Sequence, residues 1–246
     1  MKNIELWEPS KYVIQGGRLM ASRDTRHVAL GSRLCGDLVA AMYWAHFKDH
    51  CRGRLLDLGC GAVPFFEAYR SLVDEIVCVD WGGSLHDRTF LDCQADLSKA
   101  LPFADESFDT IILSDVLEHL AEPMQTWREM TRVLRVGGKV LLSVPFCYSL
   151  HEQPHDYYRY TEFALQRFAR LSGLEVVVLK PTGGAPEILA DILAKTLSGK
   201  GGLGRSAAWL VQQACGKFIA TSFGRRASTG TARNFPFGYF MIAAKR

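Results

Sequence analysis

The stretch "LLDLGCGAVPFF", residues 55–66, decides the fold of this 246-residue chain. An apolar strand runs into Gly59 and Gly61, and Pro64 then suits the first turn of a helix. Glycines at such a turn let the backbone bend sharply and approach a ligand closely. Asp80 ends the next apolar stretch, "EIVCVD" (75–80), where an acid can bind the hydroxyls of a ribose. The stretch therefore predicts a nucleoside-binding corner at the carboxyl edge of a parallel sheet.

Outward from this corner, apolar strands alternate with helical stretches. We expect strands at 54–58, 75–80, near 90–95, and at 108–114, 139–145, 174–180 and 238–245. We expect helices at 32–50, 64–72, 123–134, 161–171, 186–198 and 206–219, and an irregular segment over 1–31. Because the strands are near-continuous apolar runs, helices should cover both faces of a mostly parallel, doubly wound α/β sheet.

Composition places the chain among globular proteins, with 48% hydrophobic and 22% charged residues. No apolar run reaches the ~18 residues of a transmembrane helix, and the first ten residues have no signal-peptide pattern. The seven cysteines are scattered without a CxxC pair, which predicts reduced thiols in a cytoplasmic protein.

Charge divides the chain unevenly. Residues 1–180 hold 20 Lys and Arg against 24 Asp and Glu, a balance of −4, whereas residues 181–246 hold 9 against 2, a balance of +7. We therefore expect a helical N-terminal cap over 1–50, a sheet domain over 51–182 and 236–246, and a basic helical insertion over 183–235. The insertion could serve as a lid, a dimer face or a membrane-surface contact.

The loop after the first strand favours a ligand other than a dinucleotide. A dinucleotide loop has a third glycine, in the pattern GxGxxG, and here Pro64 takes that place. Asp57, before the first glycine, would repel a pyrophosphate but suits a ligand that carries an ammonium group. Asp96 follows the third strand and could accept a hydrogen bond from an adenine amino group.

Together these features resemble the class I S-adenosylmethionine-dependent methyltransferases. The resemblance is carried by "LLDLGCG" (55–61), Asp80, "QADLSKALPFADESFDTIILSDVLEHL" (94–120) and "REMTRVLRVGGKVLLSVPF" (128–146). It implies a Rossmann-like sheet with seven strands, of which the last, 238–245, is antiparallel. It also implies S-adenosyl-L-methionine as the cofactor.

The resemblance assigns roles to particular residues. The methionine part of the cofactor would lie among Asp57, Gly59 and Gly61. The ribose, adenine and sulfonium contacts would come from the other strand ends: Asp80 for the ribose, Trp81, Asp96 and Leu97 for the adenine, and Ser114 for the sulfonium end.

The loop "HEQPHDYYRYT" (151–161) is the candidate wall of the acceptor site. We expect His155 to be the general base, ahead of His151 and His119, with Asp156 raising its basicity. Tyr157, Tyr158 and Tyr160 could stack on a ring or donate hydrogen bonds, and Arg159 could meet an anionic group. Alternatively, Asp156, Arg159 and the tyrosines lock the loop through internal bonds.

Asp115, Glu118 and His119 raise the alternative of a metal. Their spacing, i, i+3 and i+4, would place them on one face of a helix as a three-ligand patch. Helical spacing alone is a weak signal for a metal, so we expect no metal ion and expect chelation to leave activity unchanged.

The identity of the methyl acceptor is predicted from the resemblance alone. "SKYV" (10–13) and "HEQPHDYYRYTEF" (151–163) look most like methyltransferases of bacterial glycan and natural-product clusters. This predicts O-methylation of a sugar hydroxyl in a glycan or glycoconjugate. The alternatives are a quinone or other small aromatic acceptor, a nucleic-acid methyltransferase, or a non-catalytic cofactor-binding protein. Nucleic acid is disfavoured because the basic residues are not interleaved with an aromatic platform. A homodimer and peripheral contact with the inner membrane surface are the further partners to be tested.

Overall fold

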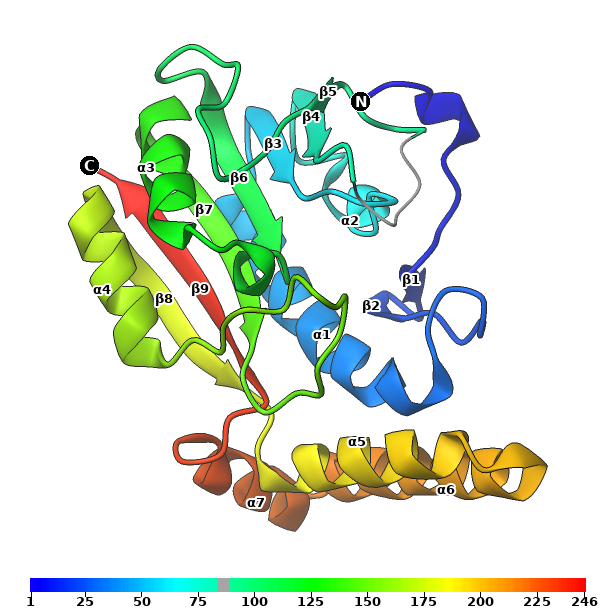
Figure 1. Cartoon of the computed structure of the whole chain (residues 1–246). Coiled ribbons are helices and arrows are strands. Elements are labelled where there is room, and N and C mark those ends of the chain that lie inside the picture. The colour runs from blue at the N-terminus through cyan, green and yellow to red at the C-terminus, as the bar shows by residue number, and fades with distance from the viewer. Residues whose placement is uncertain (84–88) are drawn as a thin grey trace.

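A seven-stranded sheet with helices on both faces forms the body of the protein (Figure 1). The computed structural model describes residues 1–83 and 89–246. The strand order is β5-β4-β3-β6-β7-β9-β8, and β9 runs antiparallel to both of its neighbours. The strands are β3 (Arg54–Leu58), β4 (Glu75–Asp80), β5 (Cys93–Gln94), β6 (Phe108–Ser114), β7 (Leu134–Pro145), β8 (Leu174–Thr182) and β9 (Gly238–Lys245). The predicted Rossmann-like sheet, with its antiparallel last strand and a helical insertion before it, is confirmed.

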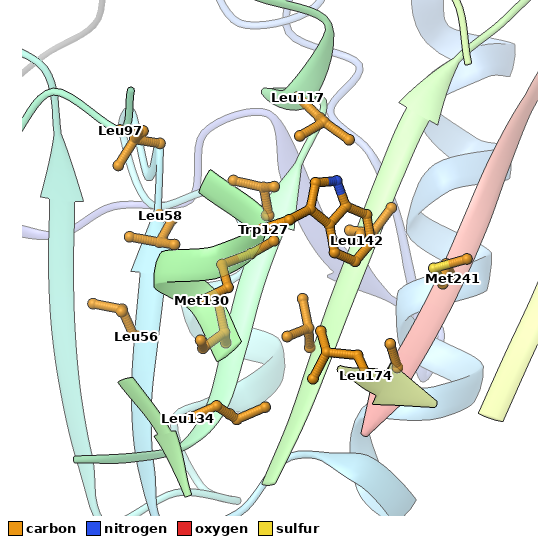
Figure 2. Close-up of a cluster of buried hydrophobic side chains, with 14 of the residues drawn as sticks. Leu56, Leu58, Leu97, Leu117, Trp127, Met130, Leu134, Leu142, Leu174 and Met241 are labelled. Atoms are coloured by element: carbon orange, nitrogen blue, oxygen red, sulfur yellow. The ribbon is translucent and has the colours of Figure 1, made fainter. Parts of the chain in front are cut away.

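Alternate side chains of the inner strand β3 pack into two separate hydrophobic clusters, one on each face of the sheet. Leu56 and Leu58 of β3 join a cluster that includes Trp127 and Met130, both fully buried (Figure 2). Leu55 points the other way, into a second cluster. Burying a side chain such as Met130 is worth about 1.5–3 kcal/mol. The first face is covered by α3 (Pro123–Val133) and α4 (Glu162–Ser172), and the second by α1 (Arg33–His50) and α2 (Phe66–Tyr69).

Helix α4 shows how the sequence sets the ends of an element. Thr161 accepts a hydrogen bond from the backbone N–H of Ala164 at 3.2 Å, as a helix N-cap should. Gly173 then ends the helix in the left-handed region, at φ +85°. Both ends lie where the sequence predicts them.

The N-terminal segment differs from its prediction. Residues 1–31 are not irregular throughout: β1 (Tyr12–Gln15) and β2 (Arg18–Ala21) form an antiparallel hairpin. Gly16 and Gly17 make its two-residue turn, at φ +58° and +73°. The expected helix at 64–72 is also shorter, because the chain turns through Val63 at φ +50° before α2 begins.

The basic insertion contains three helices where two were expected. They are α5 (Ala185–Ser198), α6 (Gly201–Ala220) and α7 (Ser222–Ala232). Helix α6 begins inside the glycine-rich stretch, and only glycine fits at Gly204, where a Cβ would lie 2.3 Å from the backbone oxygen of Leu197. The insertion packs on α1 through Gln212, which accepts from the N–H of Leu34 at 2.8 Å and donates to the carbonyl of Gly31 at 3.0 Å. Among the described residues, no helix is long and apolar enough to cross a membrane.

Candidate functional site

A cavity of about 930 Å³ opens at the carboxyl ends of the parallel strands. Residues that end or directly follow β3, β4, β6 and β7 line it. Strand β3 comes first in the chain among these strands and has β4 on one side and β6 on the other. The connections therefore leave it in opposite directions, and such a switch point is where open α/β sheets bind their ligands.

The loop after β3 contains two glycines with positive φ. Gly59 has φ +67°, and a Cβ there would lie 2.5 Å from Cγ2 of Val116. Gly61 has φ +50°, and its backbone N–H donates to Oδ2 of Asp80 at 3.1 Å. These glycines thus bring bare backbone to the wall of the cavity.

Asp57 is a buried carboxyl, and the hydrogen bonds of the protein only partly compensate for its lost hydration. The hydroxyl of Tyr69 donates to its Oδ2 at 2.8 Å. Burial nevertheless raises the pKa of Asp57 to about 7, and the neighbouring Asp80 adds to the effect. A cation placed beside Asp57 would stabilise its charged form, as an ammonium group of a ligand would do.

The other predicted cofactor residues converge on the same cavity. Asp80 accepts from the N–H of Trp81 at 2.8 Å, and the ring of Trp81 is partly exposed. Asp96 is held by the N–H of Ser98 at 3.0 Å and by Lys99 at 3.2 Å. All eight candidates line the cavity: Asp57, Gly59, Gly61, Asp80, Trp81, Asp96, Leu97 and Ser114.

Sequence reasoning missed the part of the wall that the N-terminal hairpin supplies. Ser10, Lys11 and Tyr12 line the cavity, and the ring of Tyr12 stacks on Phe65 at 4.5 Å. The buried hydroxyls of Ser10 and Tyr12 have no hydrogen-bond partner among the described residues. These hydroxyls can donate to a carboxylate, and the buried acid Asp57, which lines the same cavity, suits an ammonium group, so together they fit an amino-acid moiety. The two glycines at 16–17 were the signal for this hairpin.

The acceptor loop divides into residues that face the cavity and residues that hold the loop. His151, His155 and Tyr157 line the cavity, as does His119. Tyr158 donates to the carbonyl of Ala121 at 2.9 Å. Tyr160 is buried and donates to the carbonyl of Leu117 at 3.1 Å. Neither Tyr158 nor Tyr160 is among the described residues that line the cavity. Their hydrogen bonds hold the loop against the segment that follows β6.

Asp156 is engaged elsewhere than expected. Its two oxygens accept from Arg159 at 2.6 and 2.8 Å, and this holds its pKa low, at about 2. Asp156 also lies 3.4 Å from Nδ1 of His151, whereas Nδ1 of His155 lies 3.1 Å from the hydroxyl of Tyr157. The structure thus pairs Asp156 and Arg159 with each other and places Tyr157 beside the expected base.

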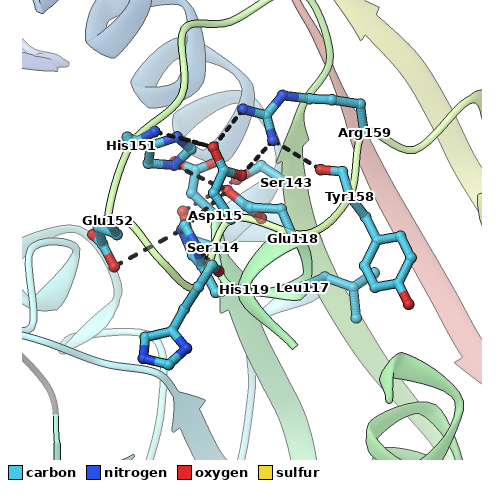
Figure 3. Close-up of polar contacts among 12 residues, drawn as sticks. Ser114, Asp115, Leu117, Glu118, His119, Ser143, His151, Glu152, Tyr158 and Arg159 are labelled. Carbon is cyan, nitrogen blue, oxygen red and sulfur yellow. Dashed lines mark hydrogen bonds and ion pairs between the residues drawn. The ribbon is translucent and has the colours of Figure 1, made fainter. Parts of the chain in front are cut away.

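The predicted helical triad does not form. Only Leu117–His119 is helical, as the short 3₁₀ turn η3, and Asp115 before it has φ +52°. Asp115 instead accepts from Ser143 at 2.9 Å and lies 3.6 Å from Lys11. His151 takes its place: single ligand atoms of Glu118, His119 and His151 all lie within 4.8 Å of one another (Figure 3). Burial raises the pKa of Glu118.

Comparison with known proteins identifies the central region. Residues 56–142, which run from β3 into β7, match a family described as "Methyltransferase domain". The match covers about a third of the chain. The demethylmenaquinone methyltransferase of Renibacterium salmoninarum is 35% identical over 95 residues, 37% of this chain. The match spans 40% of that relative's length, so the similarity covers less than half of either protein.

Solved structures confirm that the methyltransferase fold extends over most of the chain. A SAM-dependent methyltransferase from Archaeoglobus fulgidus superposes with a TM-score of 0.53 at 20% identity, over 88% of this chain and 93% of its own. The cyclase SpnF superposes with a TM-score of 0.54 at 16% identity, over 96% and 87%. Among these neighbours, the Archaeoglobus fulgidus protein is named as SAM dependent, and an N-methyltransferase from Haemonchus contortus was solved in complex with S-adenosylhomocysteine. The cyclase shows that this fold by itself does not fix the reaction.

Proposed function

We propose that the protein transfers the methyl group of S-adenosylmethionine to a hydroxyl oxygen, with a sugar hydroxyl of a glycan or glycoconjugate as the leading acceptor. The observation that carries the proposal is the shared cavity. The eight cofactor candidates and the ring-bearing residues His151, His155 and Tyr157 line one space of about 930 Å³. A cofactor and an acceptor can therefore meet there.

The chemistry needs little beyond positioning and one base. The bound cofactor supplies an electrophilic methyl group on a sulfonium sulfur. The acceptor oxygen attacks that carbon, the sulfur–methyl bond breaks, and the hydroxyl proton must leave. His155 is the proposed acceptor of this proton, because its ring lines the cavity and lies 5.3 Å from that of Trp81, the proposed adenine contact. Water exclusion and alignment by the cavity walls supply the remaining effect.

The choice of a sugar is supported by where two distant stretches meet. "SKYV" (10–13) and the loop after β7 carry the resemblance to enzymes of glycan clusters, and they lie far apart in the sequence. Ser10, Lys11 and Tyr12 from the first stretch and His151 and His155 from the second line the same cavity. The imidazoles of His151 and His155 and the ring of Tyr157, which line this cavity, suit a polyhydroxylated ring.

A quinone or related small aromatic acceptor is the second candidate. The relative from Renibacterium salmoninarum is named for methylating demethylmenaquinone, and it matches this chain over 95 residues. Tyr157 and Trp81, both partly exposed at the cavity, could sandwich a flat ring.

Transfer of labelled methyl from the cofactor into fractionated cell extract separates these acceptors. Label in polysaccharide or lipid-linked sugar supports the leading proposal, and label in the quinone fraction supports the second. Label in RNA would replace both. Binding of the cofactor with no transfer to any fraction would leave a cofactor-binding protein without methyltransferase activity.

We further propose that the basic insertion contacts an anionic membrane surface. Residues 183–235 contain seven Lys and Arg against two acidic residues, Glu187 and Asp191. Large apolar side chains stand exposed on its helices, including Leu189, Ile192, Leu203 and Leu210. None of the described lining residues of the cavity comes from α5, α6 or α7, so a lid is not the favoured role. Apolar side chains with basic neighbours suit an interface of anionic lipid.

Flotation with vesicles tests this contact. Binding to vesicles that contain anionic lipid, weakened by the exposed pair Arg225→Glu and Arg226→Glu and by salt, supports the proposal. A protein that ignores vesicles and is dimeric by light scattering would show that the insertion is a dimer face instead.

A further inference from the structure

Three polar side chains meet on the cavity wall without a hydrogen bond between them. The carboxylate of Glu118 is fully buried, and neither of its oxygens has a hydrogen-bond partner among the described residues. Oε1 of Glu118 lies 3.6 Å from Nε2 of His151 and 3.7 Å from Nε2 of His119 (Figure 3). These separations are too long for hydrogen bonds. Nε2 of His119 is also buried without a partner.

In each imidazole ring, the hydrogen-bond partner of Nδ1 determines which nitrogen carries the hydrogen. Nδ1 of His119 lies 2.8 Å from the carbonyl oxygen of His155, which can only accept, so Nδ1 must donate. Nδ1 of His151 faces two acceptors, the carbonyl of Ser149 at 3.3 Å and the carboxylate of Asp156 at 3.4 Å. In the neutral form of both rings, Nε2 is therefore a bare lone pair that points at Glu118. This outer pattern is how proteins orient histidines that bind a metal.

We propose that Glu118, His119 and His151 bind a divalent transition-metal ion, against the expectation from the sequence that the protein uses none. Two imidazole nitrogens and one carboxylate suit ions such as Zn²⁺, Mn²⁺, Fe²⁺ or Co²⁺ better than Mg²⁺ or Ca²⁺, which prefer oxygen ligands. A cation would neutralise the buried carboxylate and occupy the point that all three acceptors face.

The position of the site gives the ion a function, which rests on the proposed methyl transfer. All three residues line the cavity that also holds the cofactor candidates. Three protein ligands leave at least one coordination position open, as in catalytic metal sites. An acceptor hydroxyl that reaches this position would lose its proton more readily, since a bound cation lowers the pKa of a coordinated oxygen. The substrate class is thus narrowed to acceptors with a hydroxyl that can bind a metal.

Direct ion binding tests the site independently of turnover. The protein is stripped of metal with a chelator and then titrated with Mn²⁺ or with Co²⁺. Binding of Mn²⁺ is measured as the loss of the electron paramagnetic resonance signal of the free ion, and binding of Co²⁺ is measured by its visible absorption. We expect one ion per chain. Glu118→Gln and His151→Ala should weaken ion binding by about 100-fold or more, because each removes a ligand. His46→Gln, a histidine outside the cavity, should bind the ion as the unaltered protein does.

Binding of S-adenosylhomocysteine, measured on the same samples, shows that each variant is folded and separates the two proposals. Folded protein that binds S-adenosylhomocysteine but takes up no stoichiometric Mn²⁺, Co²⁺ or Zn²⁺ would overturn the metal site and leave the proposed methyl transfer standing. Ion binding that is unchanged in Glu118→Gln and His151→Ala would overturn it as well. Stoichiometric binding lost in both variants supports the site, even where no extract fraction accepts a methyl group.

Discussion

The backbone N–H of Gly61 donates to Oδ2 of Asp80 at 3.1 Å, so one hydrogen bond joins the loop after β3 to the end of β4. Asp80 therefore has two roles at the proposed cofactor site. It shapes the glycine loop, and it presents a carboxylate to the cavity, where it is proposed to bind the ribose. A substitution of Asp80 should weaken cofactor binding more than it lowers the stability of the hydrophobic core.

Asp80→Ala should weaken binding of S-adenosylhomocysteine. Loss of a hydrogen bond to a charged group costs about 1.5–3 kcal/mol, or roughly 10- to 150-fold in Kd. Calorimetry on the variant and on Asp96→Ala compares the two proposed contacts, and thermal unfolding shows whether the fold is intact. Unchanged affinity in folded Asp80→Ala would reject the assignment.

Binding of the cofactor should be coupled to loss of a proton from Asp57. The pKa of Asp57 is raised to about 7 in the free protein, so below that pH the carboxyl is mostly protonated. An ammonium group favours the charged form, so affinity should fall as the pH drops through 7, by up to about tenfold per pH unit. In Asp57→Asn this fall should vanish.

Calorimetry of S-adenosylhomocysteine binding in buffers of different ionisation enthalpy counts the proton directly. We expect close to one proton released near pH 6 by the unaltered protein and none by Asp57→Asn. Equal proton counts in the two proteins would show that Asp57 does not meet the ammonium group.

Gly59→Ala should damage the site more than a glycine substitution of equal backbone strain. Gly59 and Gly16 both have positive φ, +67° and +58°, but a Cβ at Gly16 meets nothing within 4 Å, whereas one at Gly59 would overlap Val116. Backbone strain alone costs about 1–2 kcal/mol. Chemical denaturation should therefore show a loss of about this size for Gly16→Ala and a larger loss, with weakened cofactor binding, for Gly59→Ala. Equal losses would mean that the contact with Val116 relaxes freely.

The cofactor side of the cavity could be predicted from the sequence because strand ends fix it. Apolar runs locate the strands, parallel pairing brings their carboxyl ends to one edge, and Asp57, Asp80, Asp96 and Ser114 then lie along that edge. For such residues, the residue type and its position at the end of a strand are sufficient to predict the location, because the pairing of the strands brings their ends together.

The acceptor side could not be predicted in the same way because its loop contacts are not periodic. The helical triad considered as the alternative metal site does not form, because Asp115 adopts φ +52°, a backbone conformation that its neighbours in sequence do not reveal. His151 lies 32 residues beyond His119 in the chain and reaches it only because the two loops meet over the sheet, with ring centres 4.7 Å apart. Asp156 likewise pairs with Arg159, three residues on, rather than with its neighbour His155.

The structure leaves His155 as the proposed base but changes its partner to Tyr157. His155→Ala should slow methyl transfer by about 10²–10⁴-fold, the usual effect of losing a general base, with binding of S-adenosylhomocysteine nearly unchanged. Tyr157→Phe removes the hydroxyl that lies 3.1 Å from Nδ1 of His155 and should cost less, because the ring nitrogen stays in place. Added imidazole should partly restore turnover to His155→Ala and not to His119→Ala, whose ring is proposed to bind a metal ion. Full turnover in folded His155→Ala would show that the ring only packs against Trp81, and that the proton leaves by another route.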